Sequence, residues 1–287
     1  MTKEVKKIGV LGAGNIGLGV VIDLLFHGYE VIMVDTDQQV RQEGKTEIIQ
    51  KLRLAPIMDS RLTAISDSEE IDRRLTITGS ITDVAECDFI IENIPENVEL
   101  KKAVYKQLEK VCPDQICFAA NTSCISITEI GSFTNRPSEV IGIHFMNPSY
   151  LKRTVEVIKG EHTSEVTIAK ARSVLEKMGK EMVLVNDLPG FVSNRISHLF
   201  MNEAAFVVQD QVADPADVDK IFKDCFGHTM GPLETADLIG LDTVVDSLEI
   251  LYQSYQDPKY RCCPLLKRMV AAGKVGKKSK VGFYSYK

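Results

Sequence analysis

The sequence predicts an α/β fold in which a doubly wound sheet domain is followed by an all-helical C-terminal domain. Three observations support this prediction. Short apolar runs alternate with longer helical segments, and near-continuous apolar runs are typical of strands buried on both faces of a parallel sheet. A glycine-rich turn follows the first apolar run, and strand-like runs largely vanish after residue 187.

The expected strands are runs rich in β-branched residues, at 7–11, 30–34, 75–78, 88–92, 116–120, 140–144, 155–158 and 182–185. Segment 165–180 carries apolar residues at helical spacing, and Gly179 fits a C-terminal cap for that helix. The alternation of strands with helices is typical of a doubly wound sheet.

A turn signal, Asp187-Leu188-Pro189-Gly190, separates the two expected domains. Behind it, segments 191–211, 215–225 and 241–255 each fit a helix. The sequence therefore predicts domains at 1–187 and 188–287, and a length of 287 residues fits two domains of about 150 residues each.

Composition excludes several classes of function. The net charge of −6 disfavours nucleic-acid binding, and no segment approaches the roughly 18 apolar residues of a membrane span. The residues before Lys7 do not resemble a secretory signal. Seven scattered cysteines without a CxxC pair and five histidines without ligand spacing predict reduced thiols and no metal. We expect a cytoplasmic protein, with Cys262-Cys263 at its surface.

The first expected strand runs into a GxGxxG motif. Gly12 permits a tight turn, Gly14 lets the backbone approach a pyrophosphate, and Gly17 allows close helix packing. Asn15 and Ile16 open the following helix, whose N-terminus offers N–H groups to phosphates. These features predict a Rossmann-type nucleotide-binding domain.

The second expected strand leads to Asp35, 18 residues past Gly17. A carboxylate there can accept hydrogen bonds from an adenosine ribose and would repel the extra phosphate of NADP. The sequence therefore predicts NAD(H). The loop alone also fits FAD, or a packing cluster of glycines without a ligand.

Two residues suit proton transfer. His144 ends the run 140–144, at the edge of an open α/β sheet where ligands bind, and Glu156 lies on the next run. Histidine titrates near neutrality, and a neighbouring carboxylate can orient the imidazole. By spacing alone, each residue also fits an ordinary structural role.

Further polar residues follow two other expected strands. Asn121-Thr122-Ser123-Cys124 comes after the run 116–120 and fits either a binding group or a turn and capping cluster. Glu96 and Lys101 come after the run 88–92 and fit either cofactor contacts or a solvated charge pair on a helix.

Together, these residues resemble the 3-hydroxyacyl-CoA dehydrogenase family over nearly the whole chain. The matching segments, in order, are 12–17, 96–97, 121–123, 144–148, 155–157, 189–195, 231–232, 237, 240–242 and 282–284. The resemblance implies that His144 removes the proton of a 3-hydroxyl group while hydride passes to the nicotinamide, with Glu156 orienting it. Ser123 and Asn194 match positions that hydrogen-bond the substrate oxygen.

The resemblance also implies the binding partners. The expected NAD contacts are Gly12, Gly14, Asn15, Ile16, Gly17, Asp35, Glu96, Lys101 and Asn121. The thioester substrate is expected in a cleft between the domains, and Asn121 is expected to seat nicotinamide or substrate. Because the helical domain of this family forms the dimer contact, we expect a homodimer.

The chain departs from the family pattern after Pro148. Lys152 and Arg153 stand where the family is apolar, which places two cations near the expected acyl pocket and favours a short or polar acyl group. The helix after Asp35 carries fewer charges than the family usually shows where it meets CoA. The substrate is therefore either a short 3-hydroxyacyl-CoA or a polar thioester on an acyl-carrier protein, such as a glyceryl thioester of polyketide extender-unit biosynthesis.

Two other classes of function were compared with this hypothesis. One is a non-enzymatic NAD-binding structural protein, against which the set of Ser123, His144, Glu156 and Asn194 argues. The other is a hydroxyacid dehydrogenase that uses a lysine base on a free carboxylate substrate, and the pairing of His144 with Glu156 argues against it.

Overall fold

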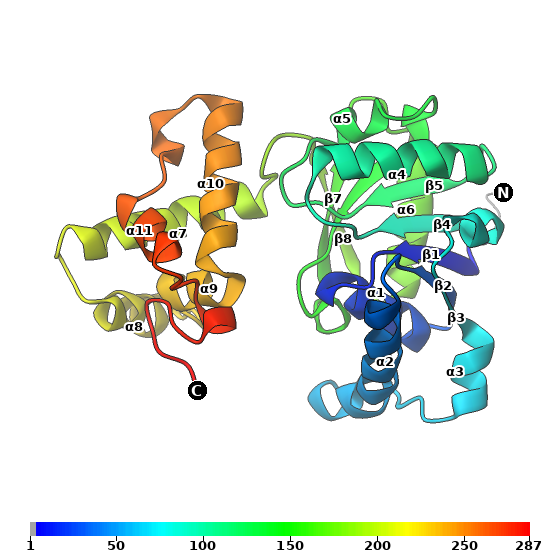
Figure 1. The fold of residues 1–287 in the computed structure, drawn as a ribbon, viewed down its shortest axis with the longest axis horizontal. Coiled ribbons are helices and arrows are strands. Elements are labelled where there is room, and N and C mark those ends of the chain that lie inside the picture. Colours follow the sequence, from blue (N-terminus) through cyan, green and yellow to red (C-terminus); the bar gives the residue numbers. More distant parts are fainter. Residues whose placement is uncertain (1–3) are drawn as a thin grey trace. The chain divides into compact units, whose positions relative to one another are not determined.

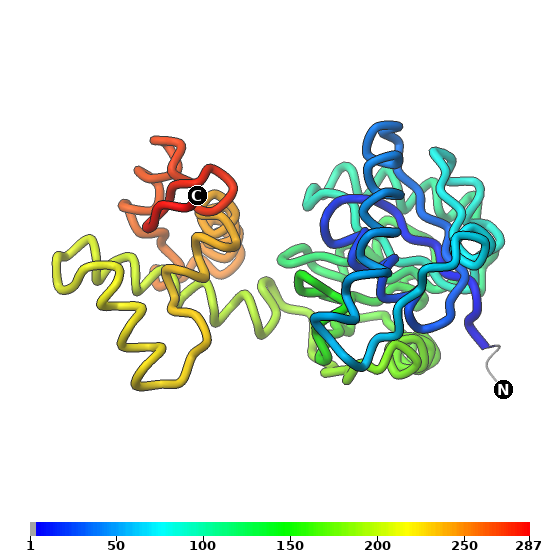
Figure 2. The backbone as a smooth tube through the Cα atoms, turned by 90° about the horizontal axis from the view of Figure 1, so that it is seen from below, coloured from blue at the N-terminus to red at the C-terminus, as the bar shows by residue number. Residues whose placement is uncertain are grey.

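A computed structural model describes residues 4–287, and the first three residues of the N-terminal segment considered above lie outside the described part. The chain forms two compact units, of which the first ends at Leu188 and the second begins at Pro189 (Figures 1 and 2). The first unit contains an eight-stranded sheet of order β3-β2-β1-β4-β5-β6-β7-β8. The strands are β1 (Lys7–Leu11), β2 (Glu30–Val34), β3 (Leu75–Thr78), β4 (Phe89–Glu92), β5 (Cys117–Ala120), β6 (Val140–His144), β7 (Thr154–Lys159) and β8 (Glu181–Asn186).

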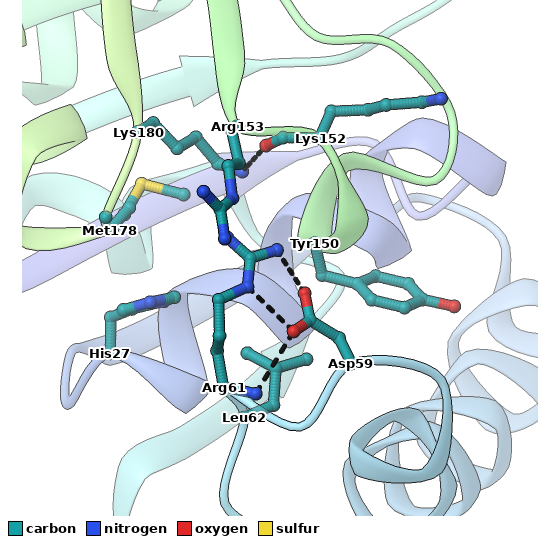
Figure 3. Close-up of a pocket in the computed structure, with 10 residues that line it drawn as sticks. His27, Asp59, Arg61, Leu62, Tyr150, Lys152, Arg153, Met178 and Lys180 are labelled. Carbon is teal, nitrogen blue, oxygen red and sulfur yellow. Dashed lines mark hydrogen bonds and ion pairs between the residues drawn. The ribbon is translucent and has the colours of Figure 1, made fainter.

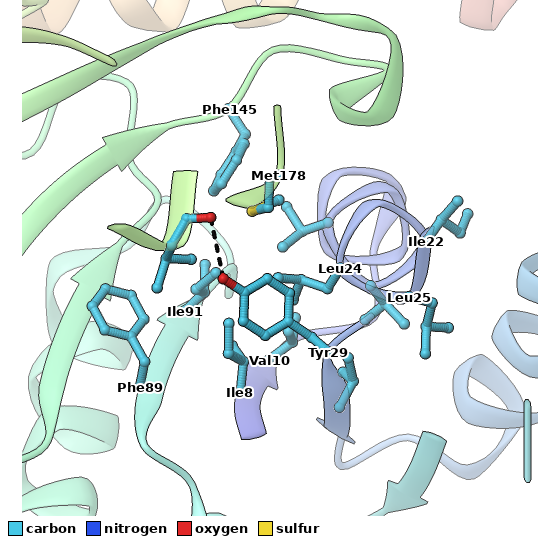
Figure 4. Packing of buried hydrophobic residues seen from close by; sticks show 14 of the residues in the cluster. Ile8, Val10, Ile22, Leu24, Leu25, Tyr29, Phe89, Ile91, Phe145 and Met178 are labelled. Atoms are coloured by element: carbon cyan, nitrogen blue, oxygen red, sulfur yellow. Dashed lines mark hydrogen bonds between the residues drawn. The ribbon is translucent and has the colours of Figure 1, made fainter. Parts of the chain in front are cut away.

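Helices cover both faces of this sheet. Those of the first unit are α1 (Asn15–Phe26), α2 (Gln38–Met58), α3 (Ser68–Arg74), α4 (Val98–Val111), α5 (Ile127–Gly131) and α6 (Glu165–Lys177). Helices α1, α2 and α6 share one hydrophobic core with the sheet, in which the buried Tyr29 hydroxyl donates to the Val174 carbonyl (Figure 4). On the opposite face, the Tyr105 ring of α4 packs edge-on against Phe118 of β5. The predicted doubly wound α/β domain is confirmed.

The direction of the last two strands differs from the parallel sheet that the sequence predicts. Strands β1 to β6 pair in parallel, but β7 pairs antiparallel with β6, and β8 is parallel to β7. The connection from β6 to β7 holds only residues 145–153 and a single 3₁₀ turn, η3 (Ser149–Leu151). Because a parallel crossover needs a dozen or more residues, so short a connection reverses the chain.

Element ends agree with the predicted ranges to within a few residues. The helix predicted over 165–180 ends at Lys177, and Gly179 follows in the left-handed region with φ +64°. The helix predicted over 191–211 is α7 (Ser193–Gln209), because Phe191 and Gln211 just beyond its ends both have positive φ.

The second unit is helical, as predicted. It contains α7, α8 (Pro215–Phe226), α9 (Pro232–Ile239), α10 (Leu241–Tyr255) and α11 (Pro264–Ala271). Cys262 and Cys263 are buried in its core, so the expectation of surface thiols is wrong. The backbone N–H of Cys263 donates to the Asn202 side chain of α7, which draws this segment against the helices.

Residues 4–287 show neither a membrane-spanning helix nor a cluster of metal ligands. No helix there combines the length and apolarity that a membrane span needs. The same residues contain no group of three or more side chains that could hold a metal ion.

Candidate active site

The glycine-rich loop between β1 and α1 is shaped by close backbone contacts. Gly12 has φ +90°, and a Cβ there would lie 2.6 Å from the Asn93 carbonyl oxygen. A Cβ on Gly17 would overlap the Gly12 carbonyl oxygen. In contrast, a Cβ on Gly14 would have no other group within 4 Å. Gly14 is the N-cap of α1 and provides no side-chain hydrogen bond to the helix. The exposed N-terminus of α1 therefore fits a pyrophosphate, which its free N–H groups can bind.

Asp35 lies beside this loop at the end of β2. Its Oδ2 accepts from the Ala13 N–H at 2.8 Å, and its Oδ1 accepts from the Asp37 N–H at 3.0 Å. The carboxylate thus contacts the turn that carries Gly12 and Gly14. This placement is the one that recognition of an adenosine ribose requires.

His144 and Glu156 are directly opposite each other in the antiparallel pairing of β6 with β7. The His144 Nδ1 lies 3.0 Å from Glu156 Oε2, and the His144 Nε2 lies 3.2 Å from the Ser123 hydroxyl. Both members of the pair are more than nine-tenths buried as side chains. If Nδ1 carries the proton toward Glu156, Nε2 is left as the acceptor of a proton from a hydroxyl group.

Glu96 positions the loop that carries Ser123. Its Oε1 accepts from the Thr122 hydroxyl at 2.6 Å and from the N–H groups of Ser123 and Cys124 at 3.0 and 2.9 Å. The Thr122 hydroxyl in turn accepts from the Ile125 N–H. Residues 121–124 are therefore a turn cluster that also directs a hydroxyl group toward His144.

Lys101 pairs with Glu92 rather than with Glu96. Its ammonium is fully buried, 2.7 and 2.9 Å from the two Glu92 oxygens and 3.2 Å from the Asn121 carbonyl oxygen. Burial raises the pKa of the Glu92 carboxyl, and the charge of Lys101 opposes that rise. Lys101 is fully buried and positions Asn121 through this contact, and its expected contact with the cofactor stays a prediction.

Asn121 uses its side chain to join three strand ends. Its Nδ2 donates to Asn93 Oδ1 at 2.8 Å, beyond β4, and its Oδ1 accepts from the Phe145 N–H at 3.1 Å, beyond β6. The amide thus contacts the residue that follows His144. Sequence reasoning missed Glu92 and Asn93 in this arrangement, although a charged residue at the end of an otherwise apolar strand was a visible signal for Glu92.

Lys152 and Arg153 are not brought to the catalytic group. They line a cavity with His27, Asp59 and Arg61, to which Ser123, His144 and Glu156 do not contribute (Figure 3). The physical reason is the packing of turn η3 on α1.

The Lys180 ammonium holds turn η3 in this place. It donates to the carbonyl groups of Ser149 and Lys152 at 2.8 and 2.7 Å and pairs with Asp23 of α1. The cavity that Lys152 and Arg153 line does not include Ser123, His144 or Glu156, and their expected contact with the acyl group stays a prediction.

Asn194 belongs to the helical unit. It lies in the first turn of α7, and its carbonyl oxygen is 3.0 Å from the His198 Nδ1. Its expected contact with a substrate stays a prediction.

Comparisons with known proteins agree with these features. Residues 7–188 match the model of the 3-hydroxyacyl-CoA dehydrogenase NAD-binding domain, and residues 190–286 match that of the C-terminal domain. The chain is 41% identical to a probable 3-hydroxybutyryl-CoA dehydrogenase of Bacillus subtilis, over 99% of this chain and 98% of the relative.

A solved structure gives the same result. The (S)-3-hydroxybutyryl-CoA dehydrogenase of Ralstonia eutropha superposes with a TM-score of 0.92 at 36% identity, covering 99% of this chain and 100% of that one. The chain therefore belongs to the 3-hydroxyacyl-CoA dehydrogenase family.

Proposed function

We propose that this protein interconverts a short 3-hydroxyacyl-CoA, such as 3-hydroxybutyryl-CoA, and the corresponding 3-ketoacyl-CoA. It is an NAD-dependent oxidoreductase that acts on a CH–OH group, as its NAD-binding domain and its relatives indicate. The observation that carries the proposal is the hydrogen-bonded chain from Ser123 through His144 to Glu156, at the carboxyl end of β6.

The residues of the first unit divide the task. NAD, when bound, supplies the hydride acceptor. The glycine-rich loop and the N-terminus of α1 bind its pyrophosphate, and Asp35 accepts hydrogen bonds from the hydroxyl groups of the adenosine ribose. Glu96 reaches the cofactor site from the loop beyond β4, while Lys101 acts through the carbonyl of Asn121.

The proton moves at His144. Its Nε2 takes the proton of the substrate 3-hydroxyl group during oxidation and returns it during reduction. Glu156 accepts from Nδ1 and stabilises the imidazolium that forms. The Ser123 hydroxyl, 3.2 Å from Nε2, binds the substrate oxygen, and Asn194 supplies a second hydrogen bond to it.

The structural placement of Lys152 and Arg153 favours CoA over a carrier protein as the thioester carrier. The carrier-protein alternative depended on two cations beside the acyl group, and the cavity that these residues line does not include Ser123, His144 or Glu156. The relatives reported above are named CoA dehydrogenases. A homodimer formed through the helical unit and a cytoplasmic location belong to the same proposal.

Spectrophotometry of NADH tests the activity directly. Purified protein mixed with NADH and acetoacetyl-CoA is expected to consume NADH, and the His144→Gln variant is expected to bind NADH without consuming it. A wild-type protein that binds NADH but does not reduce acetoacetyl-CoA would contradict the proposed substrate. A fully active His144→Gln variant would contradict the proposed base.

A further inference from the structure

A cavity of about 350 Å³ in the first unit has four cationic residues in its lining, Arg61, Lys152, Arg153 and Lys180, and one carboxylate, Asp59. The segment after α2 contributes Asp59 and Arg61, and the link between η3 and β7 contributes Lys152 and Arg153 (Figure 3). None of Ser123, His144 and Glu156 lines it. The cavity is therefore not accounted for by the proton-transfer chemistry.

The carboxylate in the lining of this cavity, Asp59, is bound by one of the two guanidinium groups, that of Arg61. Asp59 Oδ1 accepts from the Arg61 Nε at 2.7 Å and from the Arg61 backbone N–H at 3.1 Å. These hydrogen bonds lower the pKa of Asp59 to about 2, and the charge of Arg153 contributes to the same shift. Arg153 therefore lies close enough to act on Asp59, whose hydrogen bonds go to Arg61.

A second carboxylate, Asp23, does not line the cavity but pairs with Lys180, which does. Asp23 lies 2.7 Å from the Lys180 ammonium and 3.3 Å from the His27 Nδ1, and Asp23 and Lys180 are both almost fully buried. Over residues 4–287, the side chains of Lys152 and Arg153 form no ion pair or hydrogen bond. Four cationic residues thus line the cavity, while only Asp59 in its lining and Asp23 beside Lys180 supply carboxylates.

We propose that this cavity binds a phosphate-bearing anion between Arg61 and Arg153, with Lys152 at its rim. Guanidinium groups present paired N–H donors that match phosphate oxygens, and a concave wall of one charge sign concentrates its field. An anion here would lie between the two guanidinium groups and balance the charge of Arg153, which forms no ion pair within residues 4–287.

Such an anion has two sources. One is a free phosphate compound. The other is the nucleotide end of the substrate's own CoA, and this second possibility rests on the proposed function. Arg153 lies directly before β7 and precedes Glu156 by three residues, which is about 10 Å at 3.3 Å per residue of extended chain. The pantetheine arm of CoA can span that separation between the cavity and the residue opposite His144.

Titration calorimetry tests the site. The full chain, saturated with NADH to occupy the glycine-rich loop, is titrated at low salt with inorganic pyrophosphate and with adenosine 3′,5′-bisphosphate. Arg153→Gln is expected to weaken binding by about tenfold or more, because charge-assisted hydrogen bonds are lost. Arg172→Gln removes the same charge from an exposed position of α6 and is expected to change the affinity for the anion by less than about twofold.

The ratio of KM values for acetoacetyl-CoA and acetoacetyl-pantetheine separates the two sources. If CoA is the source, Arg153→Gln raises this ratio by about tenfold or more, and Arg172→Gln does not. An unchanged ratio together with lost pyrophosphate binding identifies a free anion as the ligand.

Either of two results overturns the proposal. In the first, neither anion binds. In the second, Arg153→Gln and Arg172→Gln weaken binding equally in proteins with the wild-type melting temperature. The proposed function fails separately, if neither thioester is reduced, because calorimetry still reports on the cavity.

Discussion

At the scale of single residues, three carboxylates hold the neighbouring groups of the site in position. Glu156 accepts from the imidazole of His144, Glu96 holds the Ser123 loop, and Asp35 holds the glycine-rich loop. Each carboxylate thus orients a neighbour through short hydrogen bonds. The function is therefore sensitive to removal of single charges.

Replacing Glu156 with Gln is expected to lower kcat by about 100-fold or more while NADH affinity stays unchanged. The amide keeps the size of the side chain but stabilises neither the required tautomer nor the imidazolium. Steady-state kinetics and NADH fluorescence titration measure the two quantities. Glu181→Gln, at the exposed start of β8, is the matched control. A kcat within a few-fold of wild type would refute the role of Glu156.

His27 provides a pH-dependent contribution to stability. Burial disfavours its charged form, but hydrogen bonds to the side chain and backbone of Asp23 outweigh burial, so its pKa is raised above 6.5. A raised pKa contributes stability below the unfolded value, and this is lost as pH rises through the folded value. We expect the difference in Tm between wild type and His27→Gln to be larger at about pH 5.5 than at about pH 8.5. The reverse order would show that Asp23 does not hold the imidazolium.

At the scale of elements, the ends of β4, β5 and β6 are tied together by buried polar groups. Lys101 of α4 joins Glu92 of β4 to the carbonyl of Asn121, and the Asn121 side chain reaches Phe145 beyond β6. The position of His144 is thus set by contacts from two neighbouring strands.

Lys101→Met is expected to destabilise the fold by about 3–5 kcal/mol, because it leaves the Glu92 carboxylate buried without a counter-charge. The double variant Glu92→Gln with Lys101→Met is expected to recover much of that loss, since no buried charge remains. Denaturant unfolding measures both. Equal destabilisation of the single and double variants would show that packing, not charge, explains the effect.

Two glycines in the turn before α1 are expected to affect different properties, Gly17 the stability of the fold and Gly14 the binding of NADH. Gly17→Ala would force a Cβ into the Gly12 carbonyl and is expected to cost about 1–3 kcal/mol of stability. Gly14→Ala faces open space, so we expect an unchanged Tm but NADH binding weakened by about tenfold, as the added methyl group occupies the phosphate approach. If Gly14→Ala bound NADH normally, the pyrophosphate would have to lie elsewhere.

At the scale of the whole molecule, the chain consists of two units with separate cores. The first builds its core between the sheet and α1, α2 and α6, and the second builds its own among α7, α10 and α11. The helical unit also leaves large apolar side chains exposed, among them Ile221 and Phe226, which are 51% and 66% exposed. Such side chains are expected to be covered by a partner.

Sedimentation equilibrium is expected to give a mass twice the 31.9 kDa of the chain. Phe226→Glu, which places a charge on the exposed end of α8, is expected to shift the protein toward the monomer at low concentration. Lys220→Glu, a charge change on an already polar part of the same helix, is the control. A wild-type protein that sediments as a monomer would contradict the proposed homodimer.

The sequence by itself determined the strands and helices, because buried strands are continuous apolar runs and helices carry a stripe of apolar residues. It also determined the phosphate loop, since local spacing decides whether Gly12 can turn and Gly17 can pack. His144 was placed at the end of a strand from periodicity alone. These features depend on neighbours in the chain.

Only the tertiary structure decided which distant side chains meet. The antiparallel turn of β7 places Glu156 opposite His144, and the fold pairs Lys101 with Glu92 rather than Glu96. It also places Lys152 and Arg153 in a cavity that Ser123, His144 and Glu156 do not line, because Lys180 holds turn η3 against α1. Strand direction and pairing across the sheet depend on packing between elements far apart in sequence, which local patterns of charge and apolarity do not encode.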